Sequence, residues 1–222
     1  MAGSRPEARY RDGARAIAPI GLAALAFGVT FGVLAREAGM EALAALTMSA
    51  TTFAGSAQFA AASILGAGGG VASAVVAAAL LNARYAPISL SVASEFRGGA
   101  LRRLLESQLI VDESWAISRR SDGRYDRRLL VGAGLVLYVS WVGGTALGAA
   151  GGEALGDPET LGLDAAFPAL FLALLVPLVR SGRTRAAAAA GAAIALALMP
   201  LAPAGVPIVA ASGACLLGWS RA

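Results

Sequence analysis

Long apolar runs with few charges organise this chain. Uncharged stretches occupy residues 17–35, 42–83, 129–152, 165–179 and 186–220. About 20 consecutive apolar residues cross the hydrocarbon core of a bilayer as one helix. The runs at 42–83 and 186–220 are long enough for two helices each, and glycines at 66–70 divide the first of them. The pattern predicts an all-α fold, a polytopic transmembrane bundle of six to seven helices.

The centre of the 42–83 run is too polar for an ordinary membrane helix. It carries the sequence FAGSAQF at residues 53–59. Glycine weakens a helix, and a buried glutamine must find a hydrogen-bond partner or cost free energy. Non-helical backbone at membrane depth is tolerated where protein or a water-filled cavity satisfies it. We therefore expect a broken or re-entrant helix near residues 53–59.

Arginine placement predicts the topology. Arginines lie in residues 1–16, 95–128 and 180–185 and at the C-terminus, whereas residues 153–164 and 200–205 have none. Cytoplasmic loops are enriched in basic residues. We expect a cytoplasmic segment at 1–16, a single transmembrane transporter domain at 17–222 with a cytoplasmic loop at 95–128, and both termini in the cytoplasm.

This topology requires an even number of crossings before residue 95. The candidates are residues 17–35, 42–65 and 71–94. Either one of them turns back without crossing, or one loop does not follow the enrichment of arginine on the cytoplasmic side. Residues 42–65 are the best candidate for turning back, because the middle of this segment favours a helix least. Within the 95–128 loop, Leu101, Leu104, Leu105 and Leu109 share a helical face opposite Arg102, Arg103 and Glu106. This spacing predicts an amphipathic helix lying on the inner membrane surface, in contact with the lipid bilayer.

A weak internal repeat is visible in the glycines. GxxxG elements occur at 28–32 and 144–148, and FAG at 53–55 and FPA at 167–169 follow them at similar distances. Corresponding interrupted helices in two halves of a chain point to the midplane site of a transporter. The alternative is that each GxxxG element marks close helix packing.

Composition narrows the chemistry. Apolar residues make up 57% of the chain and charged residues 14%, with a mean hydropathy of +0.68. All 18 basic residues are arginine, histidine is absent and there is one cysteine. An imidazole base, a lysine Schiff base and an intrachain disulfide are excluded. We expect no enzyme, no cofactor, no metal and no nucleic-acid partner.

A few polar residues inside the apolar runs are candidates for binding. At Gly55 and Ser56 a helix break would expose N–H groups that bind an anion, and Gln58 would add donor and acceptor capacity; the alternative is a packing notch between helices. Arg84 either lies inside the membrane and faces a cavity with a partner, or snorkels to the headgroups. Acids near the membrane segments, namely Asp112, Glu113 and Asp164, are candidates for coupling or gating; the alternative is that they are simply solvated.

The same motifs resemble those of a known family. FAGSAQF at 53–59, LNAR at 81–84, Asp112-Glu113, WVGGT at 141–145 and LGLDAAF at 161–167 are similar to motifs of the azaleucine-resistance (AzlC) family of branched-chain amino acid permeases. The resemblance runs from about residue 19 to the C-terminus. It implies a bacterial inner (plasma) membrane exporter of branched-chain amino acids, in some members methionine, built with a small AzlD-type membrane subunit. Many members have histidine where this chain has Tyr85, which removes any proton role borrowed for that position.

Together the resemblance and the residues suggest how a zwitterion would bind during alternating access. The amides of Gly55 and Ser56, with or without Arg84, would take the carboxylate. Carbonyl oxygens of Gln58 and Asn82 would take the ammonium group. Phe53, Phe59 and Met48 would surround the side chain. The alternative function is a channel-like pore, or a permease for another small zwitterionic or ionic solute.

Overall fold

The structure is a computed structural model that describes residues 8–120, 123–151, 172, 175–176, 179–202 and 206–214. Within these residues the secondary structure is helical, apart from turns and one isolated bridge between Arg119 and Tyr125, so the all-α prediction is confirmed there. The helices in chain order are α1 (Tyr10–Glu37), α2 (Ala42–Thr52), α3 (Gly55–Gly66), α4 (Val71–Asn82), α5 (Tyr85–Val92), the 3-10 turn η1 (Ala93–Glu95), α6 (Ala100–Ser107), α7 (Asp112–Ser118), α8 (Arg127–Gly151), α10 (Gly182–Leu198) and α11 (Val206–Ser212).

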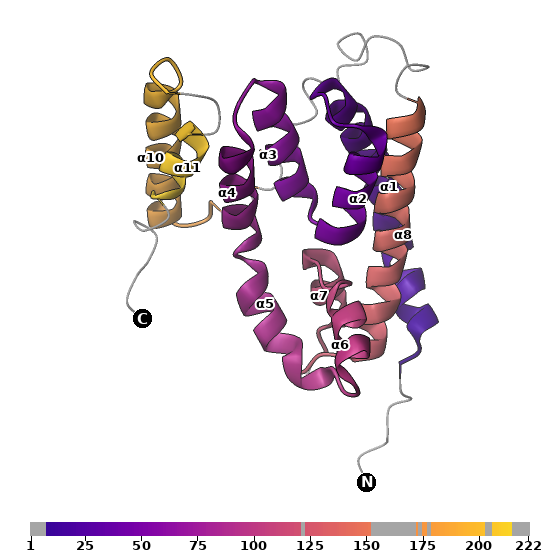
Figure 1. The fold of residues 1–222 in the computed structure, drawn as a ribbon. Coiled ribbons are helices and arrows are strands. Elements are labelled where there is room, and N and C mark those ends of the chain that lie inside the picture. Colours follow the sequence, from indigo (N-terminus) through magenta and orange to yellow (C-terminus); the bar gives the residue numbers. More distant parts are fainter. Residues whose placement is uncertain are drawn as a thin grey trace.

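Two long helices form the frame of the bundle. By length and composition α1 and α8 can each cross a membrane, and α4 with α5–η1 is a third such span if the pair, bent by 42°, is counted as one. α1 and α8 run side by side in the same direction (Figure 1). The part of the chain that the structure describes thus supports two to three spans, and it does not confirm the predicted six to seven. The predicted helix at 165–179 falls largely outside the described residues.

Glycines allow α1 and α8 to touch along their length. A Cβ atom added to Gly28 would lie 2.5 Å from the carbonyl oxygen of Trp141 and 3.2 Å from the Cα of Gly144. A Cβ on Gly21 would lie 2.9 Å from the side chain of Val136. The two GxxxG elements therefore pack against each other, as small residues do between membrane helices. The rest of the proposed repeat, at 167–169, lies outside the described residues.

The helix broken in its middle is the most unusual element. α2 ends at Phe53, which adopts a left-handed conformation (φ 42°, ψ 51°), and α3 begins at Gly55. Gly66 at the end of α3 lies against Ala38, just before α2 begins. The two arms therefore return to the same end of the bundle (Figure 1). The predicted break is confirmed, and the segment folds back on itself as a hairpin.

A second hairpin enters from the opposite end. Glu106 in α6 is bonded to Arg127 at the start of α8, and Leu109 packs on Gly134 about two turns further along α8. From Asp112 the chain returns as α7, and Ser118 accepts a hydrogen bond from the amide of Asp126. Residues 106–126 thus reach the middle of α8 and come back. Sequence analysis places these residues in a loop, whereas α7 packs against α8 and α1.

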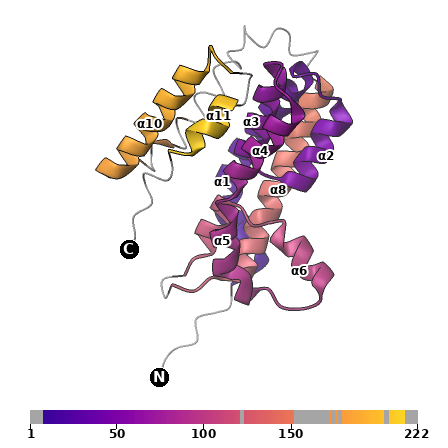
Figure 2. The ribbon, with the colours of Figure 1, turned by 60° about the vertical axis from the view of Figure 1, so that its left-hand side comes forward.

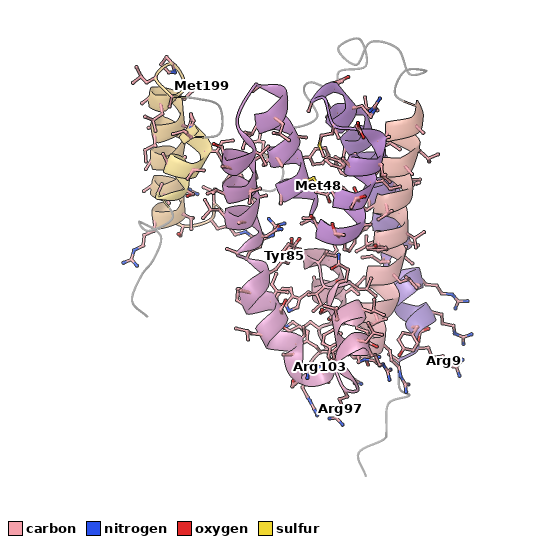
Figure 3. All side chains as sticks on the ribbon, viewed as in Figure 1. Arg9, Met48, Tyr85, Arg97, Arg103 and Met199 are labelled. Atoms are coloured by element: carbon pink, nitrogen blue, oxygen red, sulfur yellow. The ribbon has the colours of Figure 1, made fainter. Side chains whose placement is uncertain are left out.

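The remaining helices surround this core. α10 and α11 pack on each other, and α11 contacts α4 (Figure 2). On α6 the side chains of Leu101, Leu104 and Leu105 are exposed, as expected for a helix whose apolar face meets lipid. Arg9, Arg97 and Arg103 lie at the same end of the bundle (Figure 3). This agrees with the even number of crossings expected between residues 16 and 95.

Candidate functional site

A cavity lies where the two hairpin tips and the bend between α4 and α5 meet. Its volume is about 260 Å³. Five parts of the chain line it: α1, the α2–α3 break, the α4–α5 junction, the start of α7 and the middle of α8. The lining residues are Ile20, Ala23, Ala24, Phe27, Phe53, Gly55, Ser56, Phe59, Arg84, Tyr85, Val111, Asp112, Glu113, Leu137 and Trp141.

Aromatic side chains form the apolar wall. Phe59 stands edge-on to Trp141 with ring centroids 5.8 Å apart, and Phe31 packs behind both of them. Phe53 stands edge-on to Tyr138 at 5.0 Å. Such contacts fix ring positions, because aromatic pairs prefer edge-to-face geometry. Phe53 and Phe59 lie in the cavity wall, whereas Met48 packs into the neighbouring core. Their role around a substrate side chain stays a prediction.

The N-terminus of α3 opens onto the same cavity. The first N–H groups of a helix have no acceptor within the helix, and the residue before α3 is Ala54, whose side chain cannot cap them. Ser56 is 5% exposed, and its hydroxyl has no hydrogen-bond partner within the described part of the chain. Backbone N–H groups, the positive end of the helix and an unused hydroxyl together are suited to bind an anion.

Position 55 requires glycine because the indole ring of Trp141 packs close to it. A Cβ atom at this position would lie 2.9 Å from Cη2 of Trp141 and 3.3 Å from Cζ3. Distances below about 3 Å force a neighbour to move, and Trp141 is held in place by a hydrogen bond to Gln58. Glycine therefore lets the indole ring pack directly on the start of α3.

Gln58 lies behind the cavity, and both polar atoms of its side chain are hydrogen-bonded. Its Oε1 accepts from the amide of Ala54 at 3.2 Å and from the Nε1 of Trp141 at 3.0 Å, and its Nε2 donates to Ser49 at 2.8 Å. Ser49 in turn is bonded to Thr145 at 2.8 Å. These buried side chains join both arms of the α2–α3 hairpin to α8. The predicted role of Gln58 as a ligand stays a prediction, and its observed contacts hold the break in shape.

Arg84 lies at the bend between α4 and α5. Its guanidinium is 3.0 Å from the carboxylate of Asp112, donates to the Tyr85 hydroxyl at 3.3 Å and lies over the Tyr85 ring. Its Nε has no partner within the described residues. The structure thus places Arg84 in a cavity with a partner, which is the first of the two sequence-based alternatives.

The remaining predicted residues differ in where they lie. Asn82 is partly buried at the end of α4 and outside the cavity lining, and its Oδ1 has no hydrogen-bond partner among the described residues. Asp112 and Glu113 line the cavity, although sequence analysis leaves them in a loop. Asp164 lies outside the residues that the structure describes.

Two side chains that sequence analysis does not single out donate hydrogen bonds to carbonyl groups at the end of α2. Gln108 donates from Nε2 to the carbonyl of Thr51 at 2.7 Å and to that of Ala50 at 3.3 Å. Tyr138 donates to Ala50 at 2.8 Å. A helix ending at membrane depth leaves carbonyl groups that need such donors. Gln108 therefore ties the tip of the second hairpin to the break in the first.

Sequence analysis also misses other parts of the cavity wall. Trp141 appears there only within the WVGGT motif at 141–145, but it lines the cavity and donates to Gln58. The signal that could have found it is the four-residue spacing from Trp141 to Thr145, which places two polar groups on the face of α8 that carries Gly144. Tyr85, Val111 and Leu137 have no comparable signal, because each becomes part of the wall through the bends and hairpins.

Comparison with known proteins places this chain in a family. The model of the family described as AzlC protein matches residues 19–155, which include all the lining residues of the cavity. A membrane protein of Archaeoglobus fulgidus is 35% identical over 222 residues, covering 96% of this chain and 95% of that protein. The chain belongs to the AzlC family. No solved structure matches it.

Two further relatives have lower sequence identity. A membrane protein of Helicobacter pylori is 26% identical over 180 residues, 80% of this chain and 78% of that protein. The branched-chain amino acid transport protein AzlC of Bacillus subtilis is 27% identical over 161 residues, 71% of this chain and 63% of that protein. These relatives are named as membrane or transport proteins, in agreement with the apolar helices of this chain.

Proposed function

We propose that this chain transports branched-chain amino acids through the cavity between its two hairpins. The α3 N-terminus and the hydroxyl of Ser56 bind the substrate carboxylate. The aromatic wall of Phe53, Phe59 and Trp141 receives the aliphatic side chain. The observation that carries the proposal is the unpartnered, 5% exposed Ser56 at an uncapped helix N-terminus beside an apolar cavity.

The size of the cavity supports a small solute. Pockets for drug-sized ligands occupy about 300–1,000 Å³, and this cavity of about 260 Å³ lies just below that range. The name of the Bacillus subtilis relative, with its 27% identity, supports branched-chain amino acids as the substrate class. The wall has no lysine or arginine besides Arg84 among the described residues, which favours an aliphatic substrate side chain.

The proposal includes finer points that rest on the family resemblance. These are export from the cell across the bacterial inner (plasma) membrane by alternating access, transport of methionine as well, and work as the large subunit beside a small AzlD-type membrane partner. The two hairpins support alternating access, because their tips meet near the middle of α8 and either one can separate the cavity from one side.

Binding of leucine, isoleucine, valine and methionine to the purified full chain tests the substrate class. We expect saturable binding, weakened about ten- to a hundredfold in Ser56→Ala, the range for a hydrogen bond to a charged group. The matched control is Ser63→Ala, which removes an exposed hydroxyl from the same helix and leaves binding unchanged. Absence of binding to the unaltered chain contradicts the proposal.

Flux into proteoliposomes separates a carrier from a pore. A carrier saturates with amino acid concentration and exchanges labelled for unlabelled leucine across the membrane. A pore gives a current that grows in proportion to the driving force. Saturation and exchange are the expected results, and a proportional current contradicts alternating access.

A further inference from the structure

The cavity contains more negative than positive charge. Arg84, Asp112 and Glu113 line it, and Arg84 is the one cation among its lining residues within the described parts of the chain. Arg84 is 3.0 Å from Asp112, and both side chains remain partly accessible, at 36% and 43%. Glu113 is exposed to the cavity, and no ion pair to it occurs among the described residues. With both acids ionised, the lining therefore has one carboxylate more than its cations balance.

Such an arrangement is unfavourable without a further cation. Adjacent carboxylates repel, and a charge at membrane depth needs a partner. An amino acid brings one positive and one negative group. Its carboxylate has a place at Ser56 and the α3 N-terminus, so the missing cation corresponds to the ammonium group of the same substrate.

We propose that Asp112 and Glu113 bind the α-ammonium group of the substrate, and that Arg84 holds Asp112 when the site is empty. The proposal rests on the proposed function and adds the cation subsite to it. It makes the substrate class an α-amino acid with a free, protonated amino group. Ser56, buried and unpartnered in the same cavity, provides the independent sign of a ligand with a negative group.

The other candidates for the ammonium group are less suitable. The Oε1 of Gln58 already accepts two hydrogen bonds, from Ala54 and Trp141, and Gln58 does not line the cavity. The Oδ1 of Asn82 has no partner among the described residues, but Asn82 lies outside the lining. The carbonyls of Ala50 and Thr51 at the end of α2 receive Gln108 and Tyr138. Compared with these candidates, the two carboxylates line the cavity and carry the negative charge that an ammonium group needs.

Binding of three ligands to the purified full chain tests the ammonium subsite separately from the carboxylate subsite. These are leucine, the α-keto acid of leucine, which lacks the ammonium group, and the amine that leucine gives on decarboxylation, which lacks the carboxylate. We expect Glu113→Gln and Asp112→Asn to weaken leucine binding about tenfold or more, the effect of losing a charged hydrogen bond. Binding of the keto acid is expected to be unchanged or stronger, because it has no ammonium group for these carboxylates to contact and is itself an anion.

A second arm tests the role of Arg84. If this arginine is the resident cation, Arg84→Gln strengthens binding of the amine about fivefold or more, because the amine no longer competes with a fixed positive charge. Amine binding that is unchanged or weaker contradicts this role. Equal losses for leucine and the keto acid in Glu113→Gln, or no loss for either, overturn the subsite.

Controls separate this inference from folding and from the proposed function. Glu41→Gln removes an exposed carboxylate outside the cavity and is expected to leave all three affinities unchanged. Glu113→Asp keeps the charge and is expected to retain more leucine binding than Glu113→Gln. If the unaltered chain binds no branched-chain amino acid, the proposed function fails. If it binds leucine and the substitutions do not change the preference for leucine over the keto acid, the subsite alone fails.

Discussion

Ser56 and Gln58 are two residues apart in α3, and their surroundings are opposite. Both are buried and polar, at 5% and 0% exposure. The hydroxyl of Ser56 has no partner among the described residues, whereas each polar atom of Gln58 is hydrogen-bonded. A buried polar group without a partner costs free energy, so its retention suggests a ligand. A satisfied one contributes to the fold.

Gln58→Leu should therefore lower stability. The substitution leaves the indole N–H of Trp141 and the amide of Ala54 without their acceptor, and each unsatisfied group costs about 1–3 kcal/mol. We expect a loss of about 2 kcal/mol or more in the free energy of unfolding, measured by denaturation of the purified protein in detergent. Ser56→Ala is the comparison, and its stability should stay within about 0.5 kcal/mol of the unaltered chain. A larger loss in Ser56→Ala than in Gln58→Leu would reverse the two assignments.

Residue-level prediction from sequence succeeds where a side chain conflicts with its surroundings. The sequence singles out Gly55, Ser56 and Arg84 because glycine, hydroxyl and guanidinium groups are unusual in an apolar run, and all three line the cavity. It also singles out Gln58, but the sequence does not show whether its partners are a ligand or Trp141. That choice depends on α8, which is more than 60 residues further along the chain.

At the scale of elements, the α1–α8 contact provides a matched pair of glycines. Gly144 faces α1, where an added Cβ would lie 3.0 Å from the amide of Val29 and 3.1 Å from the Cα of Gly28. A Cβ on its neighbour Gly143 would meet no atom within 4 Å. We expect Gly144→Ala to reduce stability by about 1–3 kcal/mol through overpacking. Gly143→Ala should be neutral, and thermal unfolding of the two variants compares them directly.

An ion pair fixes α6 to the start of α8. Nε of Arg127 donates to Glu106 at 2.7 Å, Nε of Arg102 donates to it at 2.9 Å, and Arg127 also donates to the Tyr10 hydroxyl at 3.1 Å. The hydrogen bond from Arg127 holds the pKa of Glu106 below its ordinary value of 4.5. Because the folded-state pKa is lowered, this pair stabilises the fold above about pH 4.5 and the stabilisation is lost as the pH falls through the folded-state pKa.

Glu106→Gln tests this dependence on pH. At neutral pH the variant should unfold at a lower temperature than the unaltered chain, and the difference should shrink as the pH is lowered into the acid range. Glu41→Gln, which removes an exposed carboxylate, serves as the control and should show a small difference at every pH. A difference in unfolding temperature between Glu106→Gln and the unaltered chain that stays constant with pH would contradict the stabilising role of the ionised Glu106.

The sequence predicts one hairpin and not the other. The break in α2–α3 is visible because a glycine and polar residues interrupt a long apolar run. α7 has seven residues, begins with two acids and is flanked by arginine-rich sequence, so it has the composition of a surface loop. Its position depends on Arg84, Gln108 and Gly134, whose contacts with it or with its tip arise from tertiary packing.

At the scale of the whole molecule, the fold predicts which segments share a side of the membrane. The α2–α3 hairpin returns to its starting end, and α4–α5 then runs to the other end (Figure 1). Single cysteines at Gly68 and Ala100, introduced after replacement of Cys215, should therefore react with impermeant reagents from opposite sides. Ala100 should share its side with a cysteine at Ala8. Labelling of Ala8 and Ala100 from opposite sides would contradict the folded-back hairpin, because an α2–α3 segment that crossed the membrane would add a third crossing between them.

The hydrogen bonds that secure the α2–α3 hairpin also set an order of assembly. Gln58 is 83 residues from Trp141, and Ser49 is 96 residues from Thr145. During synthesis the chain emerges from its N-terminus, so the hairpin exists before α8 has been made. Until α8 arrives, Gln58 can bond to Ala54 and Ser49 within the hairpin, but the bonds to Trp141 and Thr145 cannot form. The cavity therefore takes shape only when α8 docks on α1, and nascent chains that stop before residue 141 should leave the hairpin open to proteases.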